Sequence, residues 1–183
     1  VRVMNKYPNI CNHIHLPLQS GSDRILNRMN RTYTKQEFLD LVKMIQSIIP
    51  NCALSTDIIV GFPGETNAEF EETLEVVRKV SFNSAFTFKY SSRPGTKASE
   101  YSDQIPEKIK QKRLETLIDI QRNITLLENQ KYIGKTLDVL IDKNSKRSSD
   151  RWSGRTEGNM RVIFNKDKSS IKDIVRVKIK SAH

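Results

Sequence analysis

The chain has 183 residues, 37% of them hydrophobic and 28% charged, with a mean hydropathy of −0.55. This length holds one ordinary domain, or one domain with a small appendix, and the composition excludes wholesale disorder. Lys and Arg total 31 against 21 Asp and Glu, a formal net charge of +10 that favours nucleic acid as a partner over a merely solvated basic surface. The excess is uneven, because residues 131–183 hold 14 Lys and Arg against 6 Asp and Glu.

Membrane insertion and secretion are not expected. No apolar run approaches the ~20 residues that span a bilayer, and no basic-then-apolar signal segment opens the chain. Cys11 and Cys52 are too few for a disulfide framework and too far apart for a C-x-x-C metal site. We therefore predict a soluble, globular protein with two reduced structural thiols, no metal ligands and no membrane partner.

The first predicted elements are a strand and two helices. Apolar residues alternate along residues 11–18, as in a half-buried strand, and a short helix is predicted over residues 23–30. Thr34 and Glu37 then form a capping box, which opens an amphipathic helix. The apolar stripe predicted for this helix is Phe38, Leu41, Val42 and Ile45.

Two further strands enclose another helix. Residues 53–60 form a β-rich apolar run, and a second capping box, Thr66 with Glu69, opens the helix that follows. Residues 85–90 form the third predicted strand. The alternation of strands and helices predicts a parallel sheet with right-handed crossovers. Three strands leave open edges, so we expect a missing part of the fold upstream.

The pattern of predicted elements changes at the end of this α/β part. A long connecting helix is predicted from Pro106 to about Tyr132, because Pro is favoured at the first helical position. Short alternating strands then follow at residues 136–141, 161–164 and 174–179. We therefore divide the chain into an α/β domain (1–104), a connecting helix (105–132) and a small all-β module (133–183).

Candidate ligand-binding residues lie where the parallel strands end. Loops at this edge, here residues 19–22, 61–65 and 91–96, are where such folds bind ligands, although each is also explained as a tight turn. Asp57 lies inside an apolar strand and needs a partner, either a ligand hydroxyl or a neighbouring structural group. Glu65 is placed to bind a ligand amine or to favour the next helix N-terminus.

Two further groups of side chains stand out. His13 and His15 alternate on one strand face without other ligands at metal spacing, which favours core or lumen histidines. In the all-β module, basic residues surround an aromatic one, as in barrels that bind oligonucleotides. The alternative is a charged loop with its aromatic residue in the core. The predicted RNA-binding residues are Lys146, Arg147, Arg151, Trp152, Arg155 and Arg161.

Three strand–loop motifs resemble those of the radical S-adenosylmethionine (SAM) methylthiotransferases. They are HLPLQSGSDRIL at residues 15–26, STDIIVGFPGET at 55–66 and FKYSSRPGT at 88–96. SGRTEGNMRVIF at 153–164 is similar to the TRAM domain that ends these enzymes, particularly in the MiaB branch and its mitochondrial relatives. The resemblance implies the C-terminal half of a partial (β/α) radical SAM barrel, followed by a small OB-like TRAM barrel.

The family's chemistry is then expected of the full-length protein. The resemblance implies SAM and two [4Fe–4S] clusters as cofactors, and tRNA and the N-terminal half of the same polypeptide as partners. The implied reaction adds a methylthio group to C2 of N6-isopentenyladenosine beside the anticodon, where an inert C–H bond requires a cofactor radical. The residues that match SAM-binding positions are Gln19, Ser20, Asp57, Gly61, Phe62, Pro63, Gly64, Glu65 and Phe88, with Tyr90 nearby.

The chain also departs from the family. The C-x-x-x-C-x-x-C motif and the N-terminal cysteines are absent, so we expect this segment to be inactive alone. The TRAM part stops at Ala182–His183, where the family usually adds a closing strand. Alternatives are a sibling enzyme acting on threonylcarbamoyladenosine or a ribosomal protein, and a non-catalytic RNA-binding fragment; residues 154–159 favour the isopentenyl branch. The resemblance implies a cytoplasmic location in bacteria and a mitochondrial one in eukaryotes.

Overall fold

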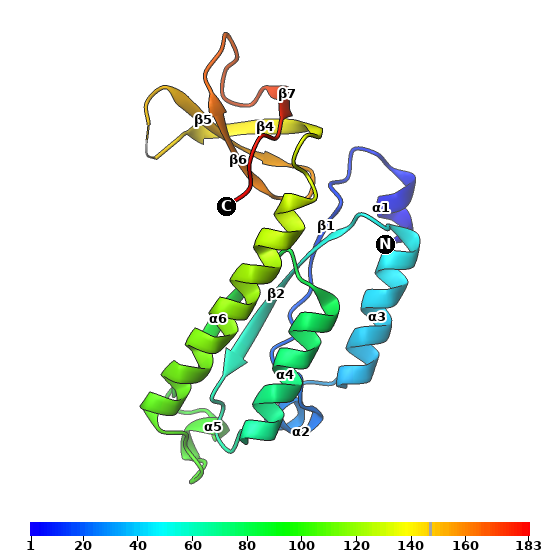
Figure 1. Ribbon diagram of the computed structural model, residues 1–183. Coiled ribbons are helices and arrows are strands. Elements are labelled where there is room, and N and C mark those ends of the chain that lie inside the picture. Colours follow the sequence, from blue (N-terminus) through cyan, green and yellow to red (C-terminus); the bar gives the residue numbers. More distant parts are fainter. Residues whose placement is uncertain (147) are drawn as a thin grey trace.

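The computed structural model describes residues 1–146 and 148–183, so the predicted RNA contact Arg147 lies outside the described residues. No helix among these residues is both long and apolar enough to cross a membrane. The elements, in chain order (Figure 1), are α1 (Arg2–Lys6), β1 (His13–His15), α2 (Asp23–Arg28), α3 (Lys35–Ile48), β2 (Ala53–Val60), α4 (Asn67–Val80), β3 (Ser84–Lys89), α5 (Lys97–Glu100), α6 (Glu107–Gln130), β4 (Thr136–Asn144), β5 (Arg151–Thr156), β6 (Arg161–Asn165) and β7 (Ile174–Lys178).

The first half is a three-stranded parallel sheet in the order β1-β2-β3, which confirms the predicted βαβαβ pattern. Helices α3, α4 and α6 share one buried apolar cluster with the sheet and cover one of its faces (Figure 1). The central strand β2 contributes Leu54, Ile58 and Val60 to this cluster. The opposite face of the sheet is open, since Phe86 and Phe88 on it are 59% and 51% exposed.

Both capping boxes form as predicted. The Thr34 and Thr66 side chains accept hydrogen bonds from the backbone N–H groups of Glu37 and Glu69, whose carboxylates accept from the cap residues in return. One prediction for the first amphipathic helix is wrong: Leu41 is 36% exposed, whereas its neighbour Leu39 is buried. Both positions flank the same apolar stripe, and Leu39 is the one that packs into the core cluster.

Helix α6 is more than a connector. It runs for 24 residues, a length of ~36 Å, and packs against β3 and α4. Gln121 Nε2 donates to the Phe82 carbonyl oxygen at 2.7 Å, and Thr125 Oγ1 donates to the Asn83 carbonyl oxygen at 3.0 Å. These bonds satisfy backbone groups at the start of β3 and make α6 part of the α/β layer.

The second half, which we call the β module (residues 133–183), contains a curled antiparallel sheet in the order β6-β5-β4-β7. Its buried core is small, with Val139, Val162 and Ile179 at the centre. Strand β5 was not predicted, because its sequence, RWSGRT, has too few apolar residues to show alternation. A register shift between Ile141 and Lys143 bends β4 and curls the sheet.

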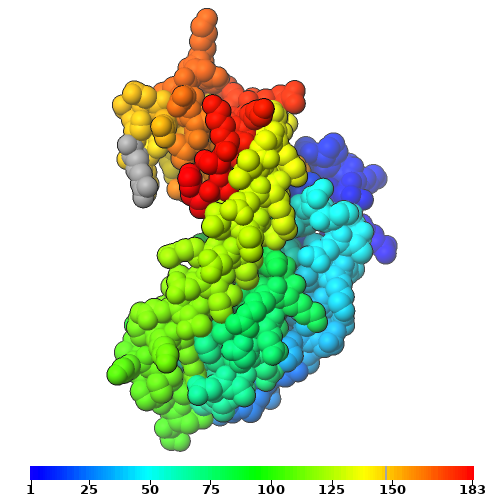
Figure 2. Space-filling view, in the orientation of Figure 1, coloured from blue at the N-terminus to red at the C-terminus, as the bar shows by residue number. Residues whose placement is uncertain are grey.

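The β module lies at the end of the parallel sheet where the strands begin. The turn between β5 and β6 reaches β2 there, since a Cβ added to Gly158 would lie 3.2 Å from the Ala53 Cβ. Figure 2 shows the module as a separate lobe, joined to the rest of the molecule through the end of α6. The loops that follow the parallel strands lie at the opposite end of α6 (Figure 1).

The close approach of Gly21 to α4 gives a test of the packing. A Cβ at Gly21 would lie 2.6 Å from the Glu72 carbonyl oxygen and 2.6 Å from the Thr73 Cα, both rigid backbone atoms. We expect Gly21→Ala to lower the free energy of unfolding by roughly 3 kcal/mol, measured by urea denaturation. The control is Gly95→Ala, which meets no atom within 4 Å but has a φ of +80°, and should cost only about 1 kcal/mol. Equal losses would contradict the steric argument.

Candidate functional site

The first candidate loop begins with a strained residue. After β1 the chain keeps contact with β2 through Gln19, whose N–H donates to the Asp57 carbonyl oxygen at 2.8 Å and whose carbonyl oxygen accepts from Ile59 at 2.9 Å. Gln19 has a φ of +64°, a left-handed conformation that is uncommon outside glycine. The residue is 6% exposed, and its side-chain amide makes no hydrogen bond to any described residue. Strain of this kind is typical of ligand-binding turns.

The Glu69 carboxylate joins the first two loops. It accepts hydrogen bonds from Arg24 Nε and Nη2, both at 2.7 Å, and from Ser22 Oγ at 3.1 Å in the first loop. It also accepts from the backbone N–H and hydroxyl of Thr66, at 2.8 Å each, just after the second loop. Arg24 further donates to the Gly64 carbonyl oxygen at 2.6 Å. These bonds, above all those from Arg24, lower the pKa of Glu69 from 4.5 to about 2.

The second loop, residues 61–65, is anchored on α6 through Glu65. The Glu65 carboxylate is fully buried and accepts from the Gly61 N–H and from Arg113 Nη1, both at 2.7 Å. Burial raises the pKa of Glu65, whereas the bonds from Gly61 and Arg113 act in the opposite direction. Gly64 donates its N–H to the Asp103 carbonyl oxygen at 2.8 Å. The carboxylate therefore faces α6, and neither of the roles expected for it from the sequence describes this contact.

Most of the predicted SAM-contacting side chains are packed within the chain. Phe62 is 6% exposed and contacts Tyr90 edge-on at 5.1 Å between ring centroids, and Pro63 is buried beside it. Ser20 is also buried, and its hydroxyl accepts from the Ser22 N–H at 3.2 Å. Asp57 and Phe88, in contrast, both reach solvent, with a 30% exposed side chain for Asp57 and 51% exposure for Phe88.

Three further polar side chains lie on the open face beside these two residues. His13 Nε2 and His15 Nδ1 each lie 3.0 Å from the Ser55 hydroxyl oxygen, and His15 Nε2 lies 3.4 Å from Asp57 Oδ2. Burial lowers the pKa of His13, and the nearby charges of His15 and of Arg155 from the β module lower it further. The sequence indicated lumen histidines here but carried no signal for Ser55 as their shared partner.

The strand pairing shows which basic residues of the β module share one face of the sheet. Arg155 pairs with Arg161 across β5 and β6, and with Leu140 across β4, so these side chains share one face. Arg151 alternates onto the same face, and so do Arg176 and Lys178 of β7, which sequence reasoning missed. The sequence signal for Arg176 and Lys178 was the alternation of side chains along IVRVK, the sequence of β7. Arg155 Nη1 donates to Asn159 Oδ1 at 2.7 Å.

Trp152 points the other way. It pairs with Phe164 on the inner face of the sheet, and the Lys166 ammonium lies 4.4 Å from the centroid of its ring. Its Nε1 is buried and has no hydrogen-bond partner in the described residues. The arginines and the half-buried indole therefore lie on opposite faces of the sheet. Lys146 is exposed in the turn before β5.

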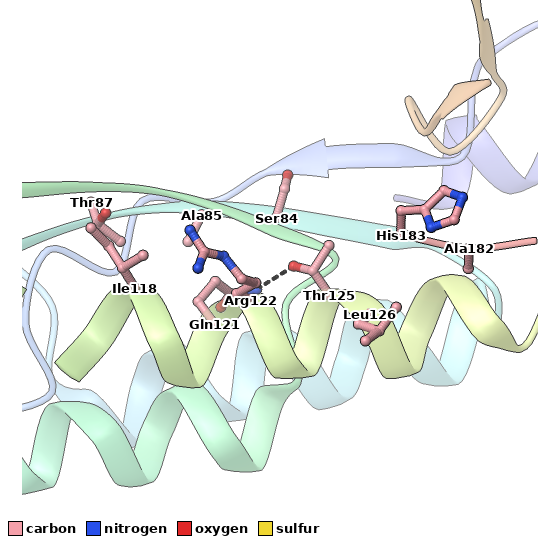
Figure 3. Close-up of a pocket in the computed structure, with 10 residues that line it drawn as sticks. All are labelled: Ser84, Ala85, Thr87, Ile118, Gln121, Arg122, Thr125, Leu126, Ala182 and His183. Atoms are coloured by element: carbon pink, nitrogen blue, oxygen red, sulfur yellow. Dashed lines mark hydrogen bonds between the residues drawn. The ribbon is translucent and has the colours of Figure 1, made fainter. Parts of the chain in front are cut away.

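Two hollows lie away from the candidate loops. A groove of about 470 Å³ runs between β3 and α6 near the C-terminal residues (Figure 3), where Gln121 and Thr125 are held by their backbone contacts to Phe82 and Asn83. A larger groove of about 1090 Å³ separates the β module from the α/β half. Lysine and arginine side chains line parts of it, namely Lys79, Lys131, Lys135 and Arg161.

Comparison with known proteins identifies the class. Residues 1–77 match the model of the radical SAM superfamily, and residues 130–183 match the TRAM domain. The chain thus carries a radical SAM segment followed by a TRAM domain, as the motifs predicted. A solved structure described as coproporphyrinogen III oxidase (HemN) from Escherichia coli, a radical SAM enzyme, is 14% identical with a TM-score of 0.53, and the match covers 80% of this chain and 41% of that one. This likeness concerns the fold alone.

More similar relatives carry one common name. Proteins called tRNA-2-methylthio-N(6)-dimethylallyladenosine synthase are 47% identical in Clostridium botulinum (strain Hall), 46% in Pelotomaculum thermopropionicum and 45% in Christiangramia forsetii. The matches cover 100%, 94% and 98% of this chain, but only 41%, 39% and 37% of those proteins. The resemblance to the MiaB-like methylthiotransferases is therefore confirmed, and the chain spans about two fifths of the length of these relatives.

The Glu69 contacts predict how stability depends on pH. Because its pKa is lowered to about 2, Glu69 stabilises the fold above pH ~4.5 and loses this contribution as the pH falls toward 2. We expect Glu69→Gln to cost roughly 2 to 3 kcal/mol at pH 7, measured by urea denaturation, and to flatten the profile between pH 5 and 2. The control is Glu71→Gln, whose exposed pair with Arg78 should contribute less than about 1 kcal/mol. If the stability of Glu69→Gln fell between pH 5 and 2 as steeply as that of the wild type, the assignment would be refuted.

Proposed function

We propose that this chain is the C-terminal part of a tRNA methylthiotransferase, which adds a methylthio group to C2 of N6-isopentenyladenosine near the anticodon. The observation that carries the proposal is identity of 45–47% across 94–100% of the chain to proteins of that name, spanning both domains in the same order. We also propose the division into residues 1–104, 105–132 and 133–183, with the TRAM domain last.

SAM is the proposed cofactor at the ends of the parallel strands. When bound, it supplies the radical that attacks an unreactive C–H bond. The exposed Asp57 carboxylate fits a ribose hydroxyl, Phe88 offers an apolar surface to the adenine, and the unpaired Gln19 amide is free to bind a polar group. The backbone of residues 61–65 and Ser20 would shape the pocket wall. Glu65 stays a prediction as a ligand contact: its Oε2 binds Gly61 and Arg113, and its buried Oε1 has no hydrogen-bond partner among the described residues.

The iron–sulfur clusters require residues outside this chain. Within residues 1–146 and 148–183, no group of three or more His, Cys, Asp or Glu side chains could hold a metal ion. The residues present therefore do not fit a cluster. We propose that cysteines in the N-terminal part of the same polypeptide hold two [4Fe–4S] clusters, and that this part also covers the open face of the sheet.

The β module is proposed to bind the tRNA. Its exposed face presents Arg151, Arg155 and Arg161 together with Arg176 and Lys178, and side chains of this kind bind phosphates. Lys146, in the preceding turn, and Arg147, which lies outside the described residues, complete the predicted contacts. Trp152 stays a prediction as a base-stacking residue, and its place on the inner face favours a structural role.

The reaction is tested on the full-length protein. We expect expression in a bacterial strain without its own methylthiotransferase to restore 2-methylthio-N6-isopentenyladenosine, detected by mass spectrometry of digested tRNA. Modified threonylcarbamoyladenosine or a methylthiolated ribosomal protein would identify a sibling enzyme. Reconstituted clusters that cleave SAM without modifying any of these substrates would overturn the proposal.

The RNA-binding face is tested by salt dependence. We expect Arg161→Ala to weaken binding of an anticodon stem–loop RNA and to reduce the slope of log K against log salt by about 1, because one phosphate contact is lost. Fluorescence anisotropy at several salt concentrations gives this slope. Lys108→Ala, an exposed lysine at the far end of α6, is the matched control and should leave it unchanged. Equal effects of the two substitutions would contradict the assignment of this face.

A further inference from the structure

A row of hydrogen-bonding side chains crosses the open face from the start of the sheet toward the candidate loops. His13 Nε2 and His15 Nδ1 both lie 3.0 Å from the Ser55 hydroxyl oxygen. His15 Nε2 lies 3.4 Å from Asp57 Oδ2, a longer contact than the other two. The strand register explains the row, because His15 pairs with Ser55 and Asp57 follows two positions later on the same face.

The chemistry of the four side chains indicates which of them donates and which accepts each hydrogen bond. Because a carboxylate only accepts hydrogen bonds, its 3.4 Å contact with His15 Nε2 favours the tautomer that has its proton on Nε2. In neutral His15 the Nδ1 atom is then an acceptor, and the Ser55 hydroxyl must donate to it. The Ser55 oxygen is left to accept from His13 Nε2–H, and burial lowers the pKa of His13 and favours its neutral form. Every donor therefore points toward Asp57.

The surroundings hold this arrangement in place and leave one end free. The Phe86 ring contacts His15 nearly edge-on at 6.0 Å between centroids, which limits rotation of the imidazole. The His15 and Asp57 side chains are 40% and 30% exposed, so the carboxylate is reached from the open face. Asp57 has no other side-chain partner in the described part of the chain. Its Oδ1 is available to a ligand.

We propose that Ser55 and His15 are positioning residues, which orient the Asp57 carboxylate so that it accepts a hydrogen bond from a nucleoside ribose hydroxyl. This rests on the proposed function, because it assumes that the open face receives SAM or the target adenosine. His13 supports the far end of the row. A carboxylate with one oxygen held by the protein loses less rotational freedom on binding than a free one, and this lowers the cost of ligand binding.

The test measures whether the ribose hydroxyl and His15 act together. In the full-length holoenzyme, dissociation constants are compared for SAM and its 2′-deoxy and 3′-deoxy analogues, and for stem–loop RNA with ribose or 2′-deoxyribose at the target adenosine. We expect loss of one hydroxyl to weaken binding roughly 10-fold in the wild type, as for a hydrogen bond to a charged group. In His15→Ala the same loss should weaken binding less than about 3-fold. If the SAM analogues show this difference, the nucleoside is SAM; if the stem–loop RNAs show it, the nucleoside is the target adenosine.

Matched variants separate positioning from general damage. His15→Gln places an amide N–H near the Nε2 position and should restore the discrimination, whereas His15→Asn should not. Ser55→Ala should reduce it, and Ser84→Ala, the paired serine on the next strand, should leave it intact. Equal discrimination in the wild type and His15→Ala, or no discrimination in the wild type, would overturn the inference. A wild type that binds neither SAM nor RNA would instead count against the proposed function.

Discussion

The Glu69 carboxylate is the contact on which the candidate site depends. Two loops that are more than 40 residues apart in the sequence meet there, because one acidic group accepts from Ser22 and Arg24 on one side and from Thr66 on the other. The same carboxylate completes the capping box of α4. One side chain thus sets both where the helix begins and how the loops lie against each other.

A second carboxylate connects this arrangement to the rest of the molecule. Glu65 and Arg113 form a buried pair, a kind of contact that gains stability only when further hydrogen bonds satisfy both partners. The Gly61 N–H and Asn67 Oδ1 provide two of these bonds, whereas Glu65 Oε1 and Arg113 Nε are buried without a hydrogen-bond partner among the described residues. Helix α6 is thereby fixed at its first turns to the second loop, and it carries the β module at its other end.

Sequence reasoning succeeded where local chemistry decides the structure. The capping boxes at Thr34 and Thr66 were predicted because their hydrogen bonds form within four residues. It gave no contact where distant parts of the chain decide the partner, as for Glu65, whose partner Arg113 lies on another element. Strand β5 was missed because its pairing with β4 and β6, rather than its own composition, creates it. The SAM and RNA contacts stay predictions, since motifs supplied them and no bound ligand tests them.

The strand pairs differ in how far apart their partners lie along the chain. Strands β1, β2 and β3 pair in parallel, and each pairing must wait until a crossover helix has closed a loop of some 30 residues or more. In the β module, β5 pairs with β4 and β6 through short hairpins. Contact order therefore favours early formation of the β4-β5-β6 meander, whereas β7, which pairs with the distant strand β4, and the parallel sheet order later and expose their strand edges for longer.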